Sequence, residues 1–297
     1  MRPLGGSTGY ARSSASKGSR IPARLRLVRQ FSPTEPVSPQ NCRKEFPMNS
    51  APLSPPSRSF RLLMLLCFLA LAGVFSLTLS PLSSLAPQGV DPDVFRWLSL
   101  VQPAILAIVC ASLGYALAHQ VSLDAPLGRA LVEKQPLRPV LEKQLAPALI
   151  GGLLSGLAVI GYIRFTAGLA PVRLELSLVS KLLYGGITEE IIARWGLMSL
   201  GVWIAVKVTA RGCQPKAIHY WIGNIVAAAL FAVGHLPVLF AASTEVSTTL
   251  VSAVVVGNML PGLVFGWLFQ SRGLEAAFIA HATAHVVSVS YLSVHFG

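Results

Sequence analysis

Seven long apolar runs dominate the 297-residue sequence and constrain its fold more than any other feature. Each is long enough to cross the hydrocarbon core of a bilayer, about 30 Å thick, as a helix. The runs cover residues 60–82, 97–117, 145–166, 176–206, 218–240, 246–269 and 274–294. The alternating pattern of a membrane barrel is missing, so helices are the structure that can satisfy the backbone in lipid. The sequence therefore predicts an all-α, polytopic membrane helix bundle with about seven transmembrane helices.

The composition agrees with a membrane protein. Of all residues, 53% are hydrophobic and only 12% are charged, which is about half the charged share of a soluble domain. The formal net charge is +12. This charge does not indicate nucleic-acid binding, because the basic residues are spread over the N-terminal segment and the short loops between apolar runs.

Residues 1–58 differ from the remainder of the chain. They are rich in Ser, Pro and Arg and lack any pattern that could form a core, so we expect a disordered, basic segment. A transit peptide would have a similar composition, and a true start at Met48 is an alternative. Residues 59–297 are then the polytopic membrane domain.

The loop charges predict an orientation. The loop between the second and third runs has four basic residues, the loop between the fourth and fifth has three, and the alternate loops have fewer. Cytoplasmic loops are enriched in Lys and Arg. We therefore expect the N-terminus in the cytoplasm and the C-terminus outside.

A few ionisable residues stand inside these runs: Glu189, Glu190, Arg194, His235, His281 and His285. A charged group at mid-bilayer costs at least about 2.5–3.5 kcal/mol, so such residues usually face a polar cavity and have a function. Glu190 and Arg194 are four residues apart and can pair on one helical face. Glu189 is rotated by about 100° from Glu190. It is thereby left available as a general base.

The histidines have helical spacing as well. Phe231 and His235 are one turn apart, and so are His281 and His285. Three imidazoles and a carboxylate could position a water molecule or bind a metal, although the HExxH motif of helical zinc proteases is missing. His235 taken alone is better interpreted as an interhelical hydrogen bond. The prediction of a site depends on the glutamates, the arginine and the histidines occurring together inside apolar runs.

Three ordered motifs complete the pattern: EExxxR at 189–194, FxxxH at 231–235 and HxxxH at 281–285. They resemble the CPBP intramembrane proteases, which group type II CAAX prenyl endopeptidases with bacteriocin-processing and immunity (Abi-like) proteins. The resemblance covers about residues 145–297 and implies a protease core there. It departs from the family at His285, where Asn or Asp is usual.

The resemblance also implies roles. Glu189 and His235 would activate the attacking water, and His281 and His285 would stabilise the oxyanion. Glu190, Arg194 and Phe231 would support the site. The catalytic type stays open between a metal-free glutamate mechanism and a divalent metal such as zinc, whose ligands would be Glu189, His235 and His281.

We therefore expect an intramembrane endopeptidase that cleaves a membrane-associated or lipidated substrate within the lipid bilayer. Two alternatives remain: a non-catalytic protein of the bacteriocin-immunity type, and a transporter or proton pathway. The chain has no internal repeat, which disfavours the transporter. Its compact size favours the inner (plasma) membrane of a bacterium.

Overall fold

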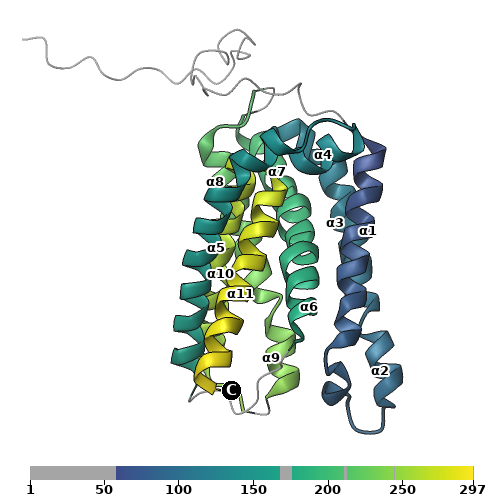
Figure 1. Ribbon diagram of the computed structural model, residues 1–297, viewed down its shortest axis with the longest axis vertical. Helices are drawn as coiled ribbons and strands as arrows, with labels where there is room; N and C mark the ends of the chain where they lie inside the picture. Colours follow the sequence, from purple (N-terminus) through teal and green to yellow (C-terminus); the bar gives the residue numbers. More distant parts are fainter. Residues whose placement is uncertain (1–57, 168–175, 211–212, 244, 297) are drawn as a thin grey trace, which may run out of the picture. The chain divides into compact units, whose positions relative to one another are not determined.

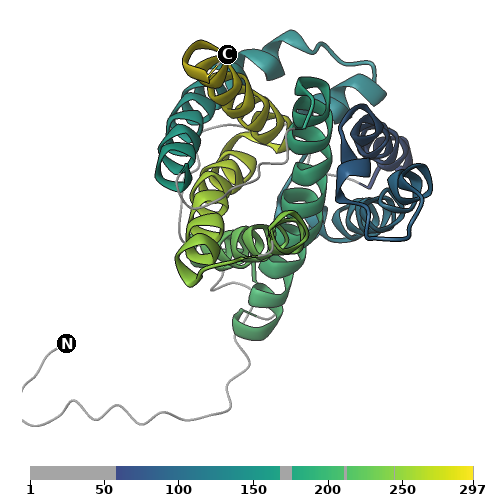
Figure 2. The ribbon, with the colours of Figure 1, turned by 90° about the horizontal axis from the view of Figure 1, so that it is seen from below.

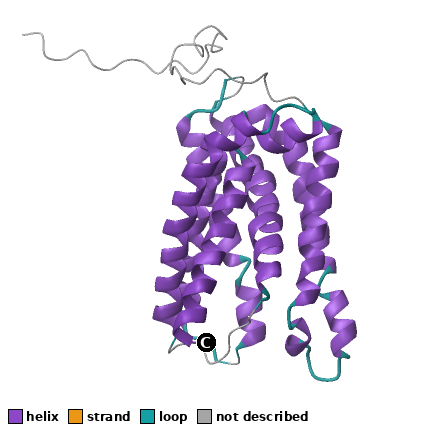
Figure 3. Ribbon diagram, in the orientation of Figure 1, coloured by secondary structure: helices purple, strands orange, loops and turns teal. Residues whose placement is uncertain are grey.

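The computed structural model describes residues 58–167, 176–210, 213–243 and 245–296, all within one compact unit, Cys42–Gly297. The expected N-terminal segment therefore lies outside the described residues, apart from its last residue. In the described part, seven helical segments are long and apolar enough to cross a membrane: Phe60–Leu79, Pro92–Val121, Arg138–Thr166, Leu178–Thr209, Ala217–Ala242, Thr248–Arg272 and Leu274–His295. These residues include no strand (Figure 3). The prediction of an all-α polytopic bundle is confirmed.

The first half of the bundle contains the first three of these spans, coloured from purple to teal in Figure 1. Its elements are α1 (Phe60–Ser76), η2 (Leu77–Leu79), η3 (Leu82–Leu85), α2 (Pro92–Leu98), α3 (Val101–Leu117), η4 (Ala118–Val121), α4 (Pro126–Val132) and α5 (Arg138–Thr166). The hydroxyl of Ser59 caps α1 by accepting from the Leu62 amide at 3.4 Å. Helix α4 crosses the end of the bundle between α3 and α5 and is too short to span a membrane.

The fourth span is built differently from its neighbours. It begins as α6 (Leu178–Ser180), continues as two π-helical stretches, η5 (Lys181–Glu189) and η6 (Ile191–Met198), and ends as α7 (Ser199–Thr209). In a π-helix the hydrogen bonds run from i to i+5, a rare pattern that often occurs at functional sites. The apolar run predicted a helix here, but it carried no signal for this hydrogen bonding.

The second half contains α8 (Ala217–Val233), α9 (Leu236–Ala242), α10 (Thr248–Arg272) and α11 (Leu274–Phe296). Viewed along the helices, the fourth span lies in the middle, between α1 on one side and α11 on the other (Figure 2). It is also the span with the largest buried share, 56%. Glu190 and Arg194 lie in its buried part, with 0% and 1% of their surfaces exposed.

Small residues let α11 approach its two neighbours closely. A side chain at Gly152 of α5 would collide with the Ala280 carbonyl of α11. On the other side, a Cβ added at Gly186 of η5 would lie 3.3 Å from the Cβ of Ala282. Close backbone approach through small residues is the usual way in which membrane helices pack. Helix α11 is therefore held between α5 and η5.

Candidate functional site

Four elements bring the polar residues of the membrane interior together. Glu189 ends η5, Glu190 stands at the junction, and Arg194 lies in η6. The last turns of α8 supply Phe231, and His235 lies between α8 and α9. Helix α11 supplies His281 and His285. Contacts between neighbouring side chains connect these seven site residues to one another.

Glu190 is the centre of these contacts. Its side chain is fully buried, with 0% of its surface exposed. One carboxylate oxygen, Oε2, lies 3.1 Å from Arg194 Nε, and the other, Oε1, lies 2.8 Å from His281 Nδ1. The pair with Arg194 agrees with the sequence spacing. The contact with His281 comes from a helix 91 residues away, and no local pattern indicated it.

Arg194 has further partners that balance its buried charge. Its Nη2 atom donates a hydrogen bond to the Gly262 carbonyl of α10 at 2.7 Å. The guanidinium carbon lies 5.0 Å from the ring centre of Phe231 and 5.6 Å from that of Phe265. A cation between aromatic faces is stabilised by their quadrupoles. Phe231 therefore supports the site through Arg194, and Phe265, which the motifs did not include, does the same.

Glu189 lies in a different environment from Glu190. Its side chain is 18% exposed, and the nearest partner of its carboxylate is His281, with Oε2 and Nε2 4.0 Å apart. Among the described residues, no hydrogen bond to this carboxylate is found. A partly accessible carboxylate without a fixed partner can accept a hydrogen bond from a bound water molecule.

The two nitrogens of His281 are distinguished by these contacts. Because Glu190 lies at Nδ1, this nitrogen carries a proton and donates it, and Nε2 faces Glu189. The ring also stacks on Phe265, with ring centres 4.7 Å apart. Second partners of this kind fix the tautomer and orientation of a histidine.

His235 is oriented in a comparable way. Its Nδ1 lies 2.8 Å from the Phe231 carbonyl, to which it donates, and its ring meets the Phe231 ring edge-on at 4.7 Å. The Nε2 atom is then the acceptor of a neutral ring. Among the described residues no hydrogen bond to this nitrogen is found, so it could accept one from a ligand.

His285 stacks on His281, with ring centres 4.8 Å apart and planes inclined by 24°. It occupies space that is left by a glycine. A Cβ added at Gly185 would lie only 2.5 Å from His285 Nε2. The imidazole at position 285 and the glycine at position 185 therefore depend on each other.

The sequence left open a metal held by Glu189, His235 and His281. Histidine and glutamate are suitable zinc donors. Within the described ranges, however, no group of three or more His, Cys, Asp or Glu side chains is arranged to hold a metal ion. The metal alternative therefore stays a prediction, and the reaction proposed below uses the side chains alone.

A hollow of about 420 Å³ between α5 and α10 is lined by apolar and small residues and includes none of the seven site residues. The polar cavity expected at the site therefore stays a prediction.

Comparison with protein families matches residues 171–287 to the family described as type II CAAX prenyl endopeptidase Rce1-like. The matched range includes all three motifs. No curated protein and no solved structure matches the chain.

Proposed function

We propose that the protein is an intramembrane endopeptidase of the glutamate type. The match of residues 171–287 to the family described as type II CAAX prenyl endopeptidase Rce1-like supports the endopeptidase class. Its substrate is a lipidated or membrane-anchored peptide, and its reaction is the hydrolysis of one peptide bond. The observation that carries the proposal is the division between the two glutamates. Glu190 is fully buried and held by Arg194 and His281, whereas Glu189 is partly exposed and, among the described residues, has no hydrogen bond to its carboxylate.

In the first step, a water molecule is held by Glu189 and by Nε2 of His235. Both groups accept hydrogen bonds, so the water oxygen keeps a lone pair for the substrate carbonyl. As the new C–O bond forms, Glu189 takes the proton that the water loses. General base catalysis of this kind contributes about 10²–10⁴-fold in rate.

The carbonyl oxygen becomes an oxyanion in this step and needs N–H donors. The neutral ring of His285 can supply one from its protonated nitrogen. His281, whose Nδ1 donates to Glu190, holds this ring in place by stacking on it. Donors fixed in a site without bulk water stabilise an oxyanion strongly, and loss of one costs about 10²–10³-fold.

In the second step, the C–N bond breaks and Glu189 returns its proton to the leaving amine. The products are a new carboxyl end on one peptide and a free amine on the other. The glutamate ends in its starting state.

The proposal is tested with the full chain reconstituted in liposomes. The probe is a synthetic peptide that ends in a farnesylated cysteine followed by three residues, as in a C-a-a-X tail. Mass spectrometry should detect the released tripeptide with the parent protein and not with Glu189→Gln. If neither this probe nor a transmembrane peptide is cleaved by the parent protein, the protein is not an endopeptidase and the binding, immunity-type function gains support.

A further inference from the structure

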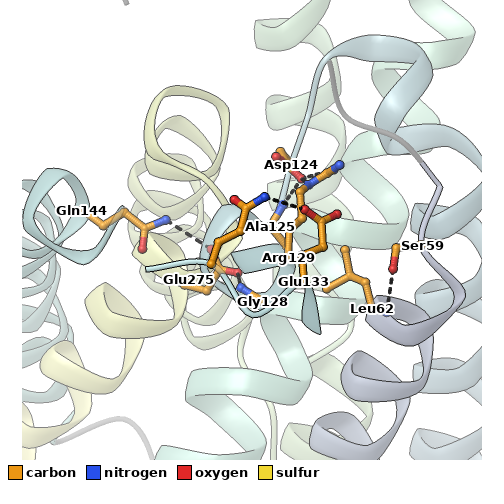
Figure 4. A network of polar contacts seen from close by, with 10 residues as sticks. Ser59, Leu62, Asp124, Ala125, Gly128, Arg129, Glu133, Gln144 and Glu275 are labelled. Atoms are coloured by element: carbon orange, nitrogen blue, oxygen red, sulfur yellow. Dashed lines mark hydrogen bonds and ion pairs between the residues drawn. The ribbon is translucent and has the colours of Figure 1, made fainter. Parts of the chain in front are cut away.

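A second buried polar cluster lies at the end of the bundle where α4, α5 and the turn between α10 and α11 meet (Figure 4). Its central residue is Glu275, in the first turn of α11, which is only 7% exposed. The Oε1 atom of Glu275 accepts a hydrogen bond from the Gly128 amide at 2.7 Å. The Oε2 atom accepts one from Gln144 Nε2 at 3.2 Å. A single carboxylate thereby connects α11 to α4 and to α5.

Further hydrogen bonds fix the start of α11. Gln144 Nε2 also donates to the Arg272 carbonyl at 2.9 Å, at the last residue of α10. The Leu274 amide donates to the Asp124 carbonyl at 3.1 Å. The residue between them, Gly273, has a φ of +102°, and a side chain there would collide with Pro126. The turn is therefore tight and requires glycine.

Glu275 also completes α4. The residue before this helix, Ala125, makes no side-chain cap, so the first amides of α4 need an acceptor from elsewhere. Glu275 supplies one from another helix, and its negative charge is favourable at the N-terminal ends of both α4 and α11. The carboxylate is thus strongly held, although it takes no part in the proposed reaction.

Glu275 and His281 lie on the same helix. Helix α11 is unbroken from Glu275 to His281, a rise of about 9 Å over six residues. A shift of the helix along its axis would therefore move His281 by the same amount. The ring of His281 stands between Glu190 at 2.8 Å and Glu189 at 4.0 Å, so a shift of about 1 Å would break one contact or obstruct the other.

We propose that Glu275 is a positioning residue for this site: by binding the Gly128 amide and the Gln144 side chain, it sets the depth of α11 and so the placement of His281. The inference depends on the proposed function only for its effect on cleavage. A misplacement of about 1 Å can cost about 10²-fold in rate. We expect the loss in kcat, because a misplaced site residue weakens an interaction that is made in the transition state.

Two variants test the proposal by removing one or both of the acceptors of Glu275. Glu275→Gln keeps one acceptor and turns an amide donor toward a neighbouring donor, and Glu275→Ala removes both acceptors. The matched control is Glu142→Gln on α5, the same change at a side chain that is 61% exposed. With the farnesylated probe, kcat per folded molecule should fall by about 10- to 100-fold in Glu275→Gln, with KM unchanged and the control unaffected.

A cysteine pair reports the depth of α11 without reference to cleavage. The pair is Gly186→Cys with Ala282→Cys. A Cβ added at Gly186 would lie 3.3 Å from the Cβ of Ala282, close to the spacing of about 3.5–4.5 Å in disulfides. Oxidation should join them rapidly in the parent and control chains. It should be slower when Glu275→Gln is added.

The outcomes are distinct. Crosslinking at the control rate in Glu275→Gln overturns the proposal, and so does a loss of cleavage that only follows the loss of folded protein. Slower crosslinking with a lower kcat supports it, and Glu275→Gln alone decides the matter if Glu275→Ala does not fold. If the parent chain cleaves no probe while crosslinking is still slower, the endopeptidase proposal fails and the positioning of α11 stands.

Discussion

Replacing Glu190 by glutamine should destabilise the protein. The carboxylate is fully buried and lies 3.1 Å from Arg194 and 2.8 Å from His281. Glutamine removes the negative charge and turns an amide donor toward one of these donors. Loss of one partner of a buried ion pair costs about 3–5 kcal/mol.

The remaining contacts of Arg194 place this loss of stability at the lower end of that range. The Gly262 carbonyl and the rings of Phe231 and Phe265 still hold the guanidinium. We therefore expect the free energy of unfolding to fall by about 3 kcal/mol. On the scale of soluble domains of similar size, this corresponds to a decrease in Tm of roughly 6–12 °C.

The assay is thermal unfolding of the purified variant in detergent, followed by tryptophan fluorescence. The double variant with Arg194→Ala should lose less than the sum of the two single variants, because the second change removes the uncompensated charge. A change below about 0.5 kcal/mol for Glu190→Gln, as surface substitutions give, would refute the assignment of Glu190 as the buried anchor of the site.

Three further changes probe other parts of the account. Gly185→Ala should displace the His285 ring and lower cleavage by about 10- to 100-fold, with a smaller effect of Gly186→Ala; equal activities in both would contradict the steric dependence. His235→Ala should lower cleavage by about 10²-fold with little change in Tm, because its ring is only half-buried, and an active variant would remove His235 from the mechanism. A reporter fused after Gly297 should be active outside the cytoplasm, whereas cytoplasmic activity would show that the orientation inferred from the loop charges is wrong.

The architecture was predictable because the membrane imposes a simple rule. A run long enough to cross the hydrocarbon must satisfy its own backbone, so seven runs predict seven helices. The backbone hydrogen bonding of the fourth span illustrates the limit of this reasoning. Its apolar pattern indicated a continuous helix, but the π-helical hydrogen bonding of η5 and η6 depends on how neighbouring helices pack against it.

The residues of the candidate site could be predicted from the sequence, but only some of the contacts between them could. Helical spacing was sufficient to pair Glu190 with Arg194, because both lie on one local element. The bond from Glu190 to His281 joins residues 91 positions apart, and the contacts of Arg194 with Gly262 and Phe265 also cross between helices. Contacts of this kind depend on tertiary packing, and a single sequence carries no signal for them. Glu275 was overlooked for a related reason, since it stands at the start of a run where an acidic residue is ordinary.

The most direct test of the account is the cleavage rate of Glu189→Gln beside its thermal stability. Glutamine keeps the size of the side chain but cannot take the proton of the attacking water. Loss of the Glu189 carboxylate should not destabilise the fold, because this carboxylate has no hydrogen bond among the described residues and the side chain is 18% exposed. The account predicts a fall in cleavage of the farnesylated probe of about 10²–10⁴-fold with a Tm near that of the parent protein. Near-normal cleavage by Glu189→Gln, or unfolding at the temperature expected for Glu190→Gln, would contradict the central claim that Glu189 is the catalytic base.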